Sequence, residues 1–210
     1  RLIFNFEAPL MTLIDLCNEA LDLVGASTIT SMADGSPEAN VCQRVHGPVI
    51  DRVLRSYPWN CAQMRALLTP LATEPAHGFS QAFELPASPY RCLRVLEVGG
   101  ADTNLVWKVE SLAAGGAIKR VILCDAPAPL PITYIRRITD PDEFDPLLAE
   151  VIIAELALRL TAKLTESASK ADAMRKLAQD RYQTAVQVDA REQGAAAYTQ
   201  DAGWLGAIGG

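Results

Sequence analysis

The chain has 210 residues, half of them apolar, and carries a formal net charge of −6 with a pI near 5.0. This length allows one sizeable hydrophobic core with a small second lobe. The acidic balance argues against a general attraction to nucleic-acid phosphates. The sequence has no run of about 18 uncharged apolar residues, so it indicates no membrane span.

The cysteines and histidines do not have the spacing of a metal site. The five cysteines are Cys17, Cys42, Cys61, Cys92 and Cys124. They form no CxxC pair, and only His46 and His77 could add imidazole ligands. We therefore expect no zinc site and no other metal site built from these residues. Most of these thiols lie among apolar residues, which is typical of small core residues in a reducing compartment.

The first part of the chain predicts two helices. Residues 1–10 precede Met11 and lack the pattern of a signal peptide, so we treat them as an N-terminal extension. Apolar spacing predicts a helix that Thr12 caps and Gly25 ends. A second helix is expected from Pro37 to about residue 57, and Pro48 should kink or split it.

The middle of the chain has the composition of a β structure. Short apolar or alternating runs occur at 59–68, 81–85, 91–98, 104–109, 117–124 and 131–138. Glycine and proline separate several of these runs, as in tight connections. Together they predict a small, mostly antiparallel β lobe.

Helical patterning returns at residue 140 and continues to 193. A ladder of leucine and isoleucine at every fourth position from Leu148 to Leu164 predicts a helix buried in a bundle. The last helix is rich in alanine, so one of its faces should remain wet. Residues 194–210 have no helical or strand period.

These elements predict a mainly α, α+β fold. Its centre would be a four-helix bundle built from residues 11–57 and 140–193, with a small antiparallel β lobe, residues 58–139, inserted between its halves. Residues 194–210 would form an extended C-terminal tail.

Four acids crowd in front of the long apolar helix: Asp140, Asp142, Glu143 and Asp145. Asp140 followed by Pro141, with Glu143 three positions after the cap, is the pattern of a capping box, and Asp145 repeats the cap further in. The alternative is a calcium or magnesium site. An EF-hand loop needs glycine at its sixth position and glutamate at its twelfth, and this segment has neither. The sequence therefore favours a helix start.

Other residue types give weaker signals. The sequence has no GxxxxGK[ST], GxGxxG or GxSxG motif. His46 lies inside a predicted helix and His77 in a loop, so neither is favoured as a catalytic base. Arg136 and Arg137 lie on opposite faces of a predicted strand, which we interpret as a solvated edge. Glu150 and Glu155 are the carboxylates in the most apolar setting, and a polar helix face or an intersubunit ion pair explains them.

Four segments together resemble one protein family. They are LIDLCNEALDLVG at 13–25, VLRSYPWNCAQMRALL at 53–68, QAFELPASPYRCLRV at 81–95, and ITYIRRITDPDEFDPLLAEVIIAELALRLTAKLTES at 132–167. In this order they resemble the tail tubular protein A family, the head-to-tail adaptors of short-tailed bacteriophages. The resemblance covers about residues 11–192.

The resemblance implies a structural protein of the virion tail, assembled in the host cytoplasm, without enzymatic activity and without a cofactor. A dodecameric ring of this chain would lie between the phage portal protein and the tail nozzle protein, and DNA would pass through it without sequence-specific contacts. The tail would dock on the portal, and its portal-binding residues would be Tyr198, Trp204, Leu205 and Ile208. Two alternatives remain open: a cell-wall hydrolase with a carboxylate pair, and a soluble helical adaptor unrelated to phage.

Overall fold

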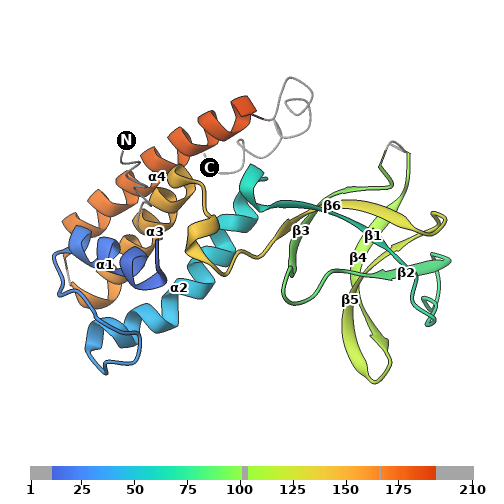
Figure 1. Ribbon diagram of the computed structural model, residues 1–210, viewed down its shortest axis with the longest axis horizontal. Helices are drawn as coiled ribbons and strands as arrows, with labels where there is room; N and C mark the ends of the chain where they lie inside the picture. The colour runs from blue at the N-terminus through green and yellow to red at the C-terminus, as the bar shows by residue number, and fades with distance from the viewer. Residues whose placement is uncertain (1–10, 101–103, 166, 193–210) are drawn as a thin grey trace, which may run out of the picture. The chain divides into compact units, whose positions relative to one another are not determined.

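The computed structural model describes residues 11–100, 104–165 and 167–192 (Figure 1). The chain divides into two compact units, one formed by Leu54–Ile138 and the other by the described residues on either side of it. We call them the β unit and the helical unit. The expected N-terminal extension, residues 1–10, and the tail, residues 194–210, lie outside the described residues.

The helical unit contains four α-helices: α1 (Leu13–Val24), α2 (Pro37–Ser56, whose last three residues belong to the β unit), α3 (Pro146–Leu164) and α4 (Ala168–Glu192). At the start of α1, Thr12 and Asp15 form a capping box, and Gly25 ends the helix in the left-handed conformation at φ 67°. The predicted bounds of this helix are confirmed. None of the described helices combines the length and apolarity needed to cross a bilayer.

The centre of the helical unit is α3, which packs against both α1 and α4. Its buried side chains occupy almost every side of the helix; they are Leu148, Ala149, Val151, Ile152, Ile153, Ala154, Leu156, Ala157, Leu160 and Thr161. By contrast, α4 buries only Ala178, Ala185 and Asp189. The helices are therefore arranged around one apolar helix, and α4 covers it while leaving most of its own surface wet.

Polar contacts tie the helices together. Lys170 Nζ of α4 donates a 2.6 Å hydrogen bond to the carbonyl of Val24 at the end of α1. A lysine at this position satisfies a carbonyl that has no partner within its own helix. Arg52 of α2 is ion-paired with Glu155 of α3. Although Pro48 lies within it, α2 is one continuous helix, so the expected split does not occur.

The β unit contains two antiparallel sheets of three strands each. The first, sheet A, has the order β1 (Gln63–Leu68), β6 (Leu130–Arg136), β3 (Cys92–Val98). The second, sheet B, has the order β2 (Gln81–Glu84), β5 (Ala117–Cys124), β4 (Trp107–Ala114). A 3₁₀ turn, Asn60–Ala62, precedes β1 and occupies part of the run expected as one strand.

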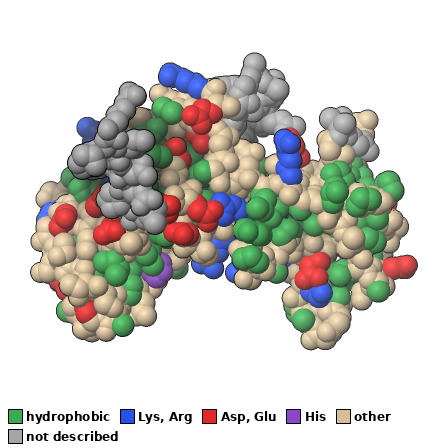
Figure 2. All heavy atoms as spheres, in the orientation of Figure 1, with side chains coloured by type: hydrophobic (Ala, Val, Ile, Leu, Met, Phe, Trp, Pro, Cys, Tyr) green, Lys and Arg blue, Asp and Glu red, His purple; other side chains and the backbone are tan. Residues whose placement is uncertain are grey.

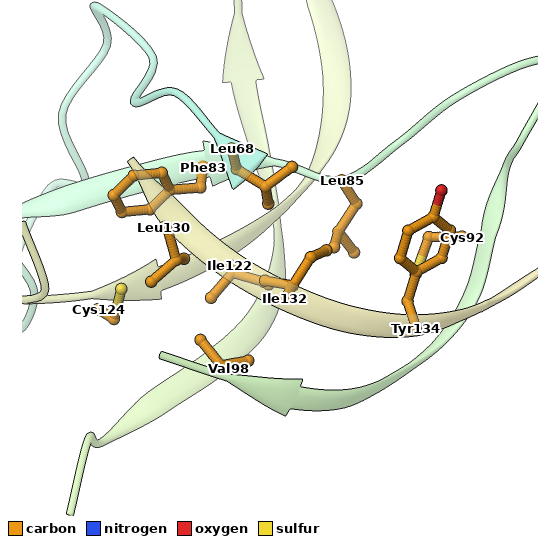
Figure 3. Packing of buried hydrophobic residues seen from close by; sticks show 10 residues of the cluster. All are labelled: Leu68, Phe83, Leu85, Cys92, Val98, Ile122, Cys124, Leu130, Ile132 and Tyr134. Atoms are coloured by element: carbon orange, nitrogen blue, oxygen red, sulfur yellow. The ribbon is translucent and has the colours of Figure 1, made fainter. Parts of the chain in front are cut away.

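The two sheets share one core (Figure 3). Sheet A contributes Leu68, Cys92, Val98, Leu130, Ile132 and Tyr134 to it. Sheet B contributes Phe83, Ile122 and Cys124, and Leu85 follows β2. The hydroxyl of Tyr134 donates to Met64 Sδ at 3.1 Å, and burial raises the pKa of this phenol. The two sheets thus pack face to face, as in a sandwich, and the other face of sheet B carries a smaller buried cluster of Ala82, Val121 and Leu123.

The predicted architecture is wrong in its main feature. The described residues form an α+β fold with 46% helix and 23% strand, and not a four-helix bundle that carries a small lobe. Among the described residues, the extensive contacts between helices are those of α3 with α1 and of α3 with α4. In a four-helix bundle, α2 would make contacts of similar extent. The β structure has two sheets and a core of its own, so it is a unit in its own right rather than a lobe.

Candidate functional site

The acidic residues before α3 are helix caps. Asp145 Oδ1 accepts hydrogen bonds from the backbone N–H groups of Leu147 at 2.9 Å and Leu148 at 3.3 Å, at the first turn of α3. Asp140 Oδ1 accepts from the N–H of Asp142 at 3.2 Å and caps a separate 3₁₀ turn, Pro141–Glu143. The capping interpretation is confirmed, but α3 begins at Pro146 rather than at residue 140, because extended backbone at Phe144 separates the two turns.

The two glutamates of α3 are held by arginines from the neighbouring helices. Glu155 is ion-paired with Arg52 of α2. Glu150 lies 3.7 Å from Arg181 of α4, and Arg181 also donates to the carbonyl of Glu150 at 3.2 Å. Both carboxylates therefore join helices of one chain, which differs from the intersubunit pairing considered from the sequence.

The described carboxyl groups with a shifted pKa accept local hydrogen bonds just before or at the start of a helix. Hydrogen bonds from Thr12 lower the pKa of Asp15, and those from Ser36 lower the pKa of Asp34. A general acid at neutral pH requires a shift in the opposite direction. Across residues 11–100, 104–165 and 167–192, no group of three or more His, Cys, Asp or Glu side chains is placed to hold a metal ion.

The remaining sequence candidates occupy structural positions. His46 Nδ1 is 2.9 Å from the carbonyl of Cys42 in the preceding turn of α2, and His77 is exposed in a loop. Arg136 ends β6 and Arg137 follows it; both are half-buried. Because β6 is the middle strand of sheet A, the expected solvated edge is wrong.

Four of the five cysteines are buried, as expected of core residues, and Cys61 is half-buried. Cys17 of α1 and Cys42 of α2 are hydrogen-bonded to each other, and this bond together with burial raises the pKa of Cys17. In the β unit, burial outweighs the nearby Arg120 and Arg55 and raises the pKa of Cys92 to about 11. A raised pKa keeps a thiol protonated and unreactive at neutral pH.

A shallow hollow on sheet A is the feature that sequence reasoning missed. It has a volume of about 430 Å³ and lies on the sheet surface away from the core. Its lining residues are Arg65, Ala66, Leu67, Glu97, Gly100, Pro131, Ile132 and Thr133. Every second residue of β1 and β6 lies on this face of the sheet, and the pairing places Arg65 opposite Thr133 and Leu67 opposite Pro131. This alternation is the pattern in the sequence that could have indicated the hollow.

The lining of this hollow combines apolar and polar side chains. Leu67 is 69% exposed, and Thr133 Oγ1 donates to Glu97 Oε2 at 3.1 Å. The lining contains no histidine and no cysteine, and Glu97, the partner of Thr133, is its single carboxylate. Figure 2 shows apolar side chains gathered over the β unit, while acidic and basic side chains are prominent over the helices.

The expected portal-binding residues Tyr198, Trp204, Leu205 and Ile208 lie outside the described residues. A scan against protein-family models and a search of curated proteins found no match to this chain.

Proposed function

We propose that this protein is a structural head-to-tail adaptor of a short-tailed phage, without enzymatic activity. The observation that carries the proposal is the succession of four motifs described above. In the structure they correspond to α1, the passage from α2 into β1, the segment from β2 into β3, and the segment from β6 through α3. The motif with the most acids, DPDEFDP, is the capped entry to α3.

Two features of the described residues support a structural role. The polar groups that could have suggested chemistry serve as caps or ion pairs: Asp140 and Asp145 cap turns, and Glu150 and Glu155 are held by arginines. In addition, α4 leaves most of its length wet, as expected of a helix that identical subunits could cover when they pack side by side.

The proposed partners follow from this role. Copies of the chain would form a dodecameric ring, with the portal protein on one side and the nozzle protein on the other. The net charge of −6 would suit a channel through which DNA slides, because basic phosphate contacts would hold the DNA. In the infected host the protein would pass from the cytoplasm into the virion tail.

The test is assembly on a portal. Thin side-to-side contacts gain strength when one template presents all docking sites at once. We therefore expect mass photometry to detect no large ring of the protein alone at about 1 µM, a dilution that disfavours weak contacts. With portal rings of its own phage, the portal should gain the mass of twelve chains of 22.7 kDa each. A portal that gains no mass at saturating protein would contradict the proposal.

A further inference from the structure

The end strand β4 of sheet B exposes a long, regular backbone edge. It has eight residues, contains no proline, and pairs with β5 without a register shift from Trp107–Cys124 to Ala114–Ala117. Figure 1 shows the two strands as one hairpin. An end strand of this kind presents unpaired N–H and C=O groups that can template pairing with another chain.

The other three end strands of the β unit have features that limit such pairing. β2 has only four residues. β3 carries two register shifts against β6, and irregularities of this kind disturb a straight edge. β1 is followed by Pro70, which forms a bridge to Phe83 of β2 at that side of the sandwich. Among the described end strands that pair without a register shift, β4 is the longest, with eight residues against six in β1 and four in β2.

The turn beside β4 determines which of its backbone groups point outward. Gly115 and Gly116 have φ of 59° and 78°, the left-handed conformations of a two-residue type I′ turn. Such a turn is closed by a hydrogen-bonded pair, here Ala114 and Ala117. Since hydrogen-bonded pairs alternate along an antiparallel ladder, the N–H and C=O groups of Trp107, Val109, Ser111 and Ala113 point away from β5.

The side chains of β4 favour one register for pairing with a second copy of itself. An antiparallel pair centred on Val109 places Lys108 opposite Glu110 of the second copy, and Glu110 opposite its Lys108. The same register brings Val106, which is 70% exposed, opposite Leu112 of the second copy. Moving the centre by one residue would instead oppose Lys108 to Lys108, or Glu110 to Glu110. Like charges directly opposite each other destabilise a strand pair.

Neither charge is already neutralised by a neighbour. Within the described parts of the chain, Lys108 and Glu110 make no ion pair, and both side chains are exposed. Both belong to the face of sheet B that lies away from the shared core, because they pair with Leu123 and Val121. They are therefore free to meet their counterparts across the edge.

We propose that two copies of this chain associate through antiparallel pairing of β4 with β4 about a two-fold axis at Val109. The contact joins two three-stranded sheets into one of six strands and closes on itself. It differs from the rotational contact between neighbours in a ring, so it belongs to the free protein and does not depend on the proposed adaptor role.

The test exchanges charges at two exposed positions. Lys108→Glu places acids opposite acids, and Glu110→Lys places bases opposite bases. We expect the dimer Kd of each single variant to be at least about tenfold higher than that of the wild type, because two like-charge pairs replace two opposite-charge pairs. The double variant Lys108→Glu/Glu110→Lys restores the pattern and should dimerise as the wild type does. An equimolar mixture of the two single variants should form a heterodimer.

Sedimentation velocity of the full chain provides the measurement, from about 5 µM to about 500 µM, because a single strand pair is a small interface. The wild type should shift from 22.7 kDa towards twice that mass as concentration rises. A third variant, Val109→Pro, removes an outward N–H without removing a bond to β5 and should abolish the shift.

The proposal is overturned if the wild type stays at the mass of one chain throughout. It is also overturned if it grows beyond two copies, if the single variants associate as the wild type does, or if their mixture fails to pair. Circular dichroism and the melting temperature check that each variant is folded. Since the experiment contains no portal, its failure would leave the adaptor proposal to its own test.

Discussion

Asp145 sets the start of α3 by accepting two backbone hydrogen bonds that would otherwise have no partner in the helix. Asp145→Ala should lower the free energy of unfolding by about 0.5–2 kcal/mol, the usual cost of losing a cap. Asp145→Asn keeps an acceptor oxygen and is the matched control. Urea denaturation measures both. If calcium or magnesium at millimolar concentration raised the melting temperature of the wild type but not of Asp145→Ala, a metal site would replace the cap.

The buried thiol of Cys92 should make the free energy of unfolding depend on pH in the alkaline range. Its pKa is raised from 9.0 to about 11, mainly by burial. Above pH 9 the unfolded chain loses this proton while the folded chain keeps it, so fewer protons are bound in the unfolded state. The free energy of unfolding should therefore fall as pH rises from about 9 to about 11.

The measurement is a series of urea denaturations across this pH range, for the wild type and for Cys92→Ala. Other groups also titrate there, so the comparison is the difference between the two slopes. The wild type should lose stability more steeply than Cys92→Ala. Equal slopes would mean that the thiol titrates at its ordinary pKa.

At the scale of the element, local patterns predicted starts and stops better than partners. The Thr12 cap and the Gly25 stop gave the bounds of α1, because both depend on chemistry within a few residues. The caps before α3 were identified, yet the helix start was misplaced, since Asp140 and Asp145 are each followed by proline and both can cap. The extended backbone at Phe144 is what separates the 3₁₀ turn capped by Asp140 from the helix α3 capped by Asp145.

The strands show where local patterns fail. Short apolar runs predicted β structure, but the register that joins β1 and β3 to β6 depends on residues far apart in the chain. The same limit hid the hollow on sheet A, whose lining comes from three strands. The contacts between helices also join residues far apart in the chain. The four-helix bundle was therefore predicted from the number of helices, without information on which helices pack together.

Pro48 offers a test within a single element. It lies inside α2, is exposed, and removes the backbone hydrogen bond that residue 48 would make to Arg44. Pro48→Ala should raise the free energy of unfolding by about 1–3 kcal/mol, since alanine restores this bond and proline's effect on the unfolded chain offsets only part of the gain. Thermal and urea unfolding measure the change. Pro37→Ala is the control at a first helical position, where proline costs little.

At the scale of the whole molecule, the chain has two kinds of surface. The helical unit packs around the apolar helix α3, carries ion pairs between helices, and leaves α4 largely wet. The β unit exposes apolar side chains such as Leu67, Val106 and Ile118, each about 70% exposed. The proposed adaptor would meet different neighbours, and surfaces of different chemistry would suit that role. The portal experiment tests this proposal.

The last prediction concerns residues 194–210, which follow α4. Trp204, with Tyr198, Leu205 and Ile208, makes this segment too apolar for a purely solvating end, and its glycines would let the backbone lie close to a partner. If these side chains bind the portal, a chain ending at Gln193 should keep the melting temperature of the full protein, because it retains every described helix and strand. It should nevertheless lose most of its portal affinity.

Single substitutions make the test sharper. Trp204→Ala should weaken portal binding by about 2 kcal/mol or more per site, as expected of an aromatic anchor in a pocket. Asp201→Ala is the matched control in the same segment, since a charge at the rim of an interface contributes little. Biolayer interferometry on immobilised portal rings measures both. Undiminished binding of the chain ending at Gln193 would mean that the portal contact lies within residues 1–193.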